Sequence, residues 1–451
     1  MSTLADRIRE VLKTHRGERP GVPQDGADHP VALPPDAGRQ TGRDHKSGLE
    51  QVLGGEWRQG DGSCFVVETR WDAAARHGGE AIATMASRLE EAVGDASILI
   101  GSPVRLPFVF FDLETTGLSG GAGSYAFLVG FGRFDEGGGF VTRQYLLVRF
   151  SDERPLLETV AGELCRAGAL VTFNGKSFDQ PVLETRSLYH RLEWTGAGVP
   201  HLDMLHAARR FWRREGDESR RDIRDAPGCS LMALERQILG TTRQGDVPSF
   251  EIPSRYFHFV RTGDARPLKG VFEHNRLDLL SLGALTTRML QLVRGGPACA
   301  RDAREAFGLG RTYARAGLDR RAEDAYGRTI ELCAPATIGT GSSAVYIEAL
   351  RALALASRRS RSYHEAAGYW QRMLEVPGCP GRLAREASEA LAIHHEHRIR
   401  DLQTAKTFAL RSLEHERRPA WDEATRHRLA RLDRKLGSLT FRGSRFEFLE
   451  P

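Results

Sequence analysis

The sequence predicts an α/β domain built on a mixed sheet flanked by helices, followed by an all-α region. Between about residues 106 and 292, three strand-like runs come first, and helices and strands then alternate. After Gly295 the strand-like runs stop, and apolar residues recur at helical spacing. At 451 residues the chain is long enough for two or three domains.

The chain divides into five predicted segments. Residues 1–50 read as a short amphipathic helix and a disordered linker rich in Gly and Pro at 16–48, and residues 51–104 as an N-terminal extension. Residues 105–294 form the α/β domain, residues 295–440 the helical region and residues 441–451 a tail. Within the extension, SCFVVETRW predicts a strand and residues 79–95 predict a helix.

The α/β pattern is read in chain order. FVFFDLE predicts a buried strand, and YAFLVGFGRF and FVTRQYLLVRF predict two more, joined by the turn-forming DEGGG. A helix at 156–165, the strand ALVTFNG, a helix at 180–192 and a short strand ending at Asp203 follow. A helix to about residue 214, a loop at 215–228 and helices at 230–239 and 272–292 complete the domain. Leading strands followed by alternation favour a sheet of mixed direction.

Composition restricts the class of protein without naming a function. The 64 basic and 59 acidic residues give a formal net charge of +5, which permits a polyanionic partner but does not require one. No two of the six Cys have metal-binding or redox spacing, so we expect free thiols in a reducing compartment. No apolar run approaches the roughly 18 residues that a membrane helix needs. We therefore expect a cytoplasmic protein with no membrane contact.

Four carboxylates from three separated segments predict one metal site. Asp112 and Glu114 lie two apart on a predicted strand, so they share a face at its carboxyl end, where α/β sheets bind ligands. Asp179 follows a strand at the start of a helix, and Asp278 follows His274 by one helical turn. Hard oxygen donors without Cys favour two divalent cations, Mg²⁺ or Mn²⁺, and such a pair suits phosphodiester cleavage. A neutral His274 could accept the proton of the attacking water.

These residues also carry a family resemblance. Residues 107–293 resemble the RNase H-like fold of the DEDD 3′→5′ exonuclease superfamily, and within it the bacterial YprB-type RNase H-like proteins. The three motifs are Asp112-x-Glu114-Thr-Thr-Gly117, Asn174-x-x-x-Phe178-Asp179 and His274-x-x-x-Asp278. The resemblance implies the four carboxylates as metal ligands, His274 as a catalytic residue, and Thr115, Asn174, Lys176 and Phe178 near the substrate. The third motif departs from the superfamily, which pairs His with a longer spacing, and this puts the role of His274 in question.

Several residues support a structural interpretation beside the functional one. Asn174 could brace its loop, Lys176 could be an ordinary exposed lysine, and Asp203 reads as a helix N-cap. Gly120, Gly121 and Gly123 predict a loop. The arginines between 209 and 224 could follow a phosphate backbone or form a solvated helix face. HHEH at 394–397 lacks the spacing of a zinc-binding helix, so we expect surface histidines.

The helical region resembles tetratricopeptide repeats. Leu309, Gly310, Tyr313, Ala322 and Tyr326 fit that repeat, and looser copies span 348–376 and 389–415. A generic helical bundle is the alternative. Tyr313, Tyr326 and Trp370 fall at core positions of the repeats.

The resulting hypothesis is a metal-dependent 3′→5′ exonuclease acting on DNA or RNA, with a single-stranded end as the expected substrate. The repeats would bind a protein partner or extend the nucleic-acid path. The alternative is an adaptor that binds nucleic acid without cutting it and acts through its repeats.

Overall fold

The computed structural model describes residues 44–58, 64–117, 123–213, 229–333, 342–414 and 419–443. Outside these residues lie the helix expected near the N-terminus, the loop at 215–228, Gly120, Gly121 and residues 444–451 of the tail expected at 441–451. Residues 44–48, expected at the end of the linker, instead belong to a helix, α2 (Asp44–Leu53). In the described part of the chain, no helix has the length and apolar character needed to cross a membrane.

A seven-stranded mixed sheet forms the first region, as the sequence predicts. Its order is β1-β2-β7-β6-β5-β8-β9. The strands are β1 (Glu56–Arg58), β2 (Cys64–Trp71), β5 (Phe108–Thr115), β6 (Ala126–Phe134), β7 (Phe140–Leu146), β8 (Ala169–Thr172) and β9 (His201–Asp203). Neighbours from β1 to β5 are antiparallel, whereas β5, β8 and β9 are parallel. The expected N-terminal extension therefore supplies two strands that continue the sheet beyond β7.

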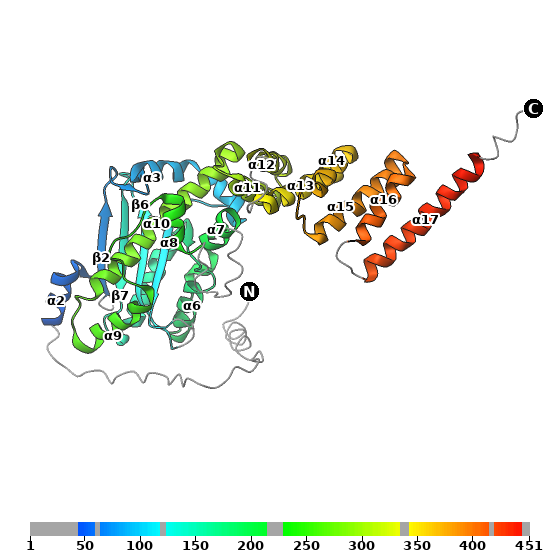
Figure 1. Cartoon of the computed structure of the whole chain (residues 1–451). Helices are drawn as coiled ribbons and strands as arrows, with labels where there is room; N and C mark the ends of the chain where they lie inside the picture. The colour runs from blue at the N-terminus through cyan, green and yellow to red at the C-terminus, as the bar shows by residue number, and fades with distance from the viewer. Residues whose placement is uncertain are drawn as a thin grey trace, which may run out of the picture. The chain divides into compact units, whose positions relative to one another are not determined.

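Helices cover both faces of this sheet (Figure 1). Those of the α/β region are α3 (Ile82–Glu91), α4 (Ala96–Ile100), α5 (Glu153–Cys165), α6 (Asp179–Tyr189), α7 (Met204–Trp212), α8 (Leu231–Leu234), α9 (Ile252–Thr262) and α10 (Leu268–Gly295). Short 3₁₀ turns are η1 (Val93–Asp95), η2 (Phe150–Asp152), η3 (Thr195–Gly198), η6 (Ser249–Glu251) and η7 (Gly296–Cys299). A small two-stranded sheet pairs β3 (Arg76–His77) with β4 (Glu80–Ala81). The helix expected at 230–239 is α8 followed by a π-helical turn, η5 (Glu235–Leu239).

The alternation of β5 divides the core between the two faces. Phe108 and Phe110 are buried in one cluster with Leu279 and Leu282 of α10. Val109, Phe111 and Leu113 are buried in another with residues of α5, α6 and α9. Odd and even positions of one strand thus serve two cores, which fixes the face on which the acidic end of β5 lies.

The second region is all-helical, as predicted. Its helices are α11 (Ala303–Arg315), α12 (Asp319–Leu332), α13 (Ser342–Arg359), α14 (Tyr363–Leu374), α15 (Gly381–His394), the π turn η9 (His395–Ile399), α16 (Leu402–Leu413) and α17 (Pro419–Gly443). A Cβ on Gly310 would lie 2.4 Å from the ring of Tyr326, so the glycine lets α11 and α12 approach closely. Tyr313, Tyr326 and Trp370 are buried, in agreement with the expected core positions. Assignment of these pairs to the tetratricopeptide family remains a prediction.

Candidate active site

Asp112 and Glu114 lie on the α10 face of β5. They continue the face of Phe108 and Phe110, where the apolar run ends and the strand reaches its last residues. Both are partly buried between the sheet and α10. The sequence produces this arrangement because four apolar residues anchor the strand in the core and only its tip carries charge.

Asn275 of α10 holds Asp112 in position. Its Nδ2 donates to Asp112 Oδ2 at 2.7 Å, and its Oδ1 accepts from Gln144 Nε2 at 2.9 Å. Asn275 is 0% exposed. A Cβ on Gly130, the β6 partner of Asp112, would lie 2.2 Å from Asn275 Oδ1. The glycine is therefore required for α10 to bring an amide against the sheet at this point.

Asp179 is the first residue of α6 and is 5% exposed. The loop before it is fastened by Asp203, whose carboxylate accepts from the backbone N–H groups of Asn174 at 2.9 Å and Lys176 at 3.2 Å. Asp203 also accepts from Leu205 N at 3.0 Å and so caps α7, which confirms the expected N-cap. One buried acid thus positions the loop that presents another.

Asp278 lies in a buried ionic network with His274. His274 Nδ1 is 2.8 Å from Asp246 Oδ1, and its Nε2 is 3.6 Å from Asp278 Oδ2. The Arg243 guanidinium pairs with Asp278 and Glu235, and its NH1 lies 3.2 Å from Asp246 Oδ2. His274 is 6% exposed, so its ring is held between two carboxylates.

Burial and the charges of neighbouring acids raise the pKa of three of the four carboxylates, Asp112, Glu114 and Asp179. Burial first, then the charges of Asp278, Glu114 and Asp179, raise the pKa of Asp112 well above its usual range, and the hydrogen bond from Asn275 lowers it in part. The pKa of Glu114 is raised by burial and then by Asp278, Asp179 and Asp246. Burial, followed by Asp203 and Asp278, raises the pKa of Asp179 to about 8. Burial is the largest cause for all three acids and repulsion from neighbouring acids adds to it, and a nearby cation would relieve both effects.

The donor set fits a divalent cation in its chemistry. It consists of carboxylate oxygens, carries surplus negative charge and contains no thiolate. As the side chains stand, no group of three or more His, Cys, Asp or Glu in the described residues is gathered closely enough to hold an ion. Arg243 on Asp278 and Asn275 on Asp112 occupy oxygens that such an ion would share.

The remaining predicted site residues differ in how exposed they are. Thr115 is buried and its hydroxyl donates to the Gly117 carbonyl at 2.9 Å, so it supports the turn after β5. Asn174 is exposed with φ of 67°, a left-handed conformation that Asn tolerates, and Phe178 precedes α6 partly buried. Lys176 is exposed at the edge of a hollow of about 400 Å³ that Gln180 and His201 also line.

Three polar residues near the site were not anticipated. Arg243 and Asp246 lie between η5 and η6 in a segment without helical or strand periodicity. Asn275 is one residue after His274 and three before Asp278, which places it on the same side of α10 as Asp278. That spacing could have identified Asn275 from the sequence, whereas no sequence pattern marks Arg243 or Asp246.

Comparison with known proteins agrees with this picture in part. Residues 109–290 match the family model of the RNase H superfamily. The chain is 32% identical over 261 residues to the uncharacterized protein YprB of Bacillus subtilis (strain 168). That alignment covers 56% of this chain and 59% of the relative.

Proposed function

We propose that the chain is a metal-dependent nuclease that removes nucleotides from the 3′ end of a DNA or RNA strand. The observation that carries the proposal is the convergence of Asp112, Glu114, Asp179 and Asp278 from a strand tip, a helix start and a helix face. The RNase H superfamily match suggests a nuclease and a nucleic-acid substrate. The polarity rests on the resemblance of the three motifs to the 3′→5′ exonucleases.

The four carboxylates would hold two divalent cations. Such ions lower the pKa of an attacking water and stabilise the departing oxygen of a phosphodiester. Because burial and repulsion disfavour the ionised forms of Asp112, Glu114 and Asp179, these carboxylates are suited to cations rather than to a neutral ligand. Mg²⁺ and Mn²⁺ match this all-oxygen set.

The surrounding residues orient these carboxylates. Asn275 fixes one oxygen of Asp112, and Arg243 fixes Oδ1 of Asp278. His274 is fixed by Asp246 on Nδ1, which leaves Nε2 directed at Asp278. In this proposal His274 accepts a proton through Nε2, and Asp246 holds the ring in the required orientation.

A second candidate is a nucleic-acid-binding adaptor without nuclease activity. The observation in its favour is that Arg243 already neutralises Asp278 and that no described group stands ready to hold an ion. The surplus of buried acids at Asp112, Glu114 and Asp179 counts against it, because an adaptor gains nothing from repulsion that destabilises the fold.

The test uses the full-length chain with 3′-labelled and 5′-labelled single strands of DNA and RNA in Mn²⁺, beside Asp112→Asn. This variant keeps the shape of the side chain and removes its charge. A product ladder that shortens from the 3′ end and disappears in the variant supports the nuclease. Equal products from both proteins overturn it, and binding without cleavage by either protein identifies the adaptor.

A further inference from the structure

The C-terminal half of α7 packs against α11, the first helix of the all-helical region. Trp212 Nε1 donates to Glu305 Oε1 at 3.1 Å. A Cβ on Gly308 would lie 2.8 Å from the Phe211 ring and 3.0 Å from the Arg210 carbonyl oxygen. This glycine permits the close approach of the two helices, which fixes the line along which they touch. We call this line the α7–α11 seam.

Three arginines gather along the α7–α11 seam. Arg210 NH1 donates to Thr312 Oγ1 at 3.4 Å, which places its guanidinium on the Thr312 side of α11. Arg311 precedes Thr312, and Arg315 lies one turn beyond Arg311 on the same side of that helix. Arg210 is half-buried, while Arg311 and Arg315 are exposed.

No carboxylate in the described part of the chain forms an ion pair with Arg210, Arg311 or Arg315. The nearest buried acid on α11, Glu305, is already bonded to Arg288, Trp212 and the backbone N–H of Arg301. Burial, and then repulsion from Arg315 and Arg311, lowers the pKa of Arg210 to about 10. The α7–α11 seam therefore presents positive charge that this part of the protein leaves uncompensated.

We propose that Arg210, Arg311 and Arg315 form a phosphate-binding site that holds the backbone of a nucleic-acid strand. The proposal rests on the proposed function for the class of its ligand. Guanidinium groups match phosphate oxygens in geometry, and arginines without a carboxylate partner can bind them without first breaking an ion pair.

The position of the α7–α11 seam suits a strand that enters the carboxylate site. Asp203, the N-cap of α7, repels the Asp179 carboxylate, and Arg210 follows about 10 Å along the helix axis. A strand with its end at the carboxylates could therefore place a phosphate further along its length at the seam. A dinucleotide contains a single phosphodiester, so it would reach only one of the two places.

The test measures binding of a fluorescent dinucleotide and of a fluorescent single strand of about 20 nucleotides to the full-length chain in EDTA, over a range of salt concentrations. In the variant Arg311→Ala/Arg315→Ala we expect at least about tenfold weaker binding of the long strand. We expect little change for the dinucleotide. The dependence of log K on log salt should become shallower by about 0.7 for each phosphate that the variant no longer binds.

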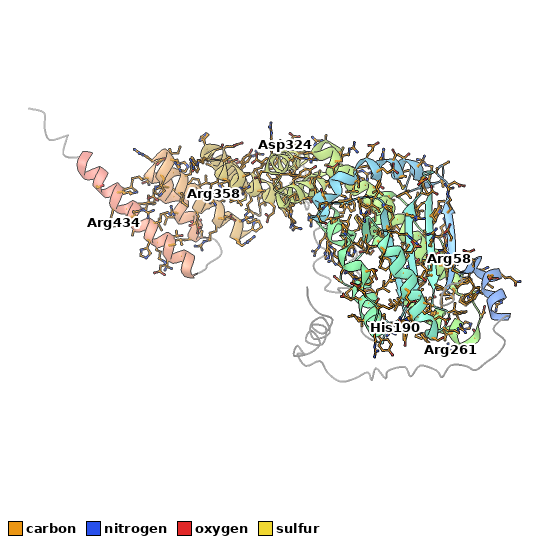
Figure 2. All side chains as sticks on the ribbon, turned by 180° about the vertical axis from the view of Figure 1, so that it is seen from behind. Arg58, His190, Arg261, Asp324, Arg358 and Arg434 are labelled. Carbon is orange, nitrogen blue, oxygen red and sulfur yellow. The ribbon has the colours of Figure 1, made fainter. Side chains whose placement is uncertain are left out.

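The matched control is Arg426→Ala/Arg434→Ala, which removes the same charge from exposed positions of α17 (Arg434 is labelled in Figure 2). Arg311→Lys/Arg315→Lys keeps the charge and should recover part of the affinity. Equal loss of affinity in the α17 variant and the seam variant means that net charge alone acts, and this overturns the site. An unchanged slope of log K against log salt in the seam variant also overturns the site. That result is expected if the seam binds an acidic protein instead of nucleic acid.

The two proposals fail separately. Loss of long-strand affinity without cleavage by the unmodified chain retains the phosphate site and rejects the nuclease. Cleavage that depends on Asp112, together with unchanged binding by the seam variant, retains the nuclease and rejects the site.

Discussion

Two buried acids in different regions of the molecule have pKa values shifted in opposite directions. Glu396 in η9 is 4% exposed, and Asp179 at the start of α6 is 5% exposed. Hydrogen bonds from Arg431 and Lys435 lower the pKa of Glu396 to about 2. Burial and the charges of Asp203 and Asp278 raise the pKa of Asp179 to about 8.

A low exposed fraction alone therefore does not decide whether the pKa of an acid is raised or lowered, because the charges of its neighbours also act on it. Glu396 joins α17 to the turn after α15 through Arg428, Arg431 and Lys435, so its charge is compensated. Asp179 lies near the acids Asp203 and Asp278, and no basic residue in the described part of the chain forms an ion pair with it. We expect substitutions at the two kinds of position to change stability in opposite directions.

The largest effect is expected at Arg243, the cation inside the acidic site. Arg243→Gln leaves Glu235, Asp246 and Asp278 without their shared partner, and removing one member of a buried ionic network costs about 3–5 kcal/mol. Denaturant unfolding measures the loss. The control is Arg154→Gln, which breaks an exposed pair with Glu158 and should cost under about 0.5 kcal/mol. Equal losses in both variants would mean that the network contributes no more than a surface pair.

Glu396→Gln should destabilise the chain by about 2 kcal/mol at neutral pH, allowing for screening of its half-exposed partners. The pKa of Glu396 is lower in the folded chain than its usual value of 4.5. Its contribution is thus fully present above about pH 4.5 and is lost as pH falls towards 2. Unfolding followed across this range should show the difference between the variant and the unmodified protein shrinking in acid. A constant difference would contradict this account of Glu396.

Gly130→Ala tests how closely α10 approaches the sheet beside Asp112. The new Cβ would meet Asn275 Oδ1 at 2.2 Å, so Asn275 must move away from Asp112 at a cost of about 2 kcal/mol. The proposed nuclease activity should fall as well as the stability, because Asp112 loses its orienting hydrogen bond. Gly162→Ala is the matched control: it lies in α5 with no atom within 4 Å of the added Cβ, and it should stabilise the helix slightly. Unchanged stability of Gly130→Ala would show that Asn275 does not hold Asp112 as described.

The features that could be predicted from the sequence are those that depend on neighbouring residues in the chain. Asp112 and Glu114 were identifiable because an apolar run with a period of two ends in charges, and Asp203 because a short polar residue separates a strand from a helix. The mixed direction of the sheet followed from three leading strands. The pairing of β2 with β7 was not predicted, because register between distant segments leaves no local trace.

The rest of the site depends on distant contacts. Asn275 is a polar residue inside a long helix, and it acquires its role only where Gly130 and Gln144 meet it. Arg243 and Asp246 lie in an irregular segment, which carries no periodicity to interpret. Glu396 lies within HHEH, where the histidines are the more conspicuous residues and only His397 is clearly exposed. The role of each of these residues depends on contacts between segments that are far apart in the sequence.

The smallest expected change in stability is at Asp179, where we expect substitution to stabilise the chain. Because substitution of Glu396 should destabilise it, Asp179 gives the sharpest test of the comparison between the two acids. The pKa of Asp179 is higher in the folded chain than its usual value of 3.8, so ionisation costs stability as pH rises from about 4 through 8. Asp179→Asn removes that cost and should stabilise the chain by about 1–2 kcal/mol at neutral pH in EDTA, while abolishing cleavage.

Asp203→Asn is the contrasting variant at a neighbouring buried acid. Asp203 accepts from the backbone N–H groups of Asn174, Lys176 and Leu205, so its loss should destabilise the chain. Mn²⁺ should raise the melting temperature of the unmodified protein more than that of Asp179→Asn, because the variant offers one carboxylate fewer. If Asp179→Asn is instead as destabilising as Asp203→Asn, Asp179 is a structural acid like Glu396, and the metal site loses one of its four proposed ligands.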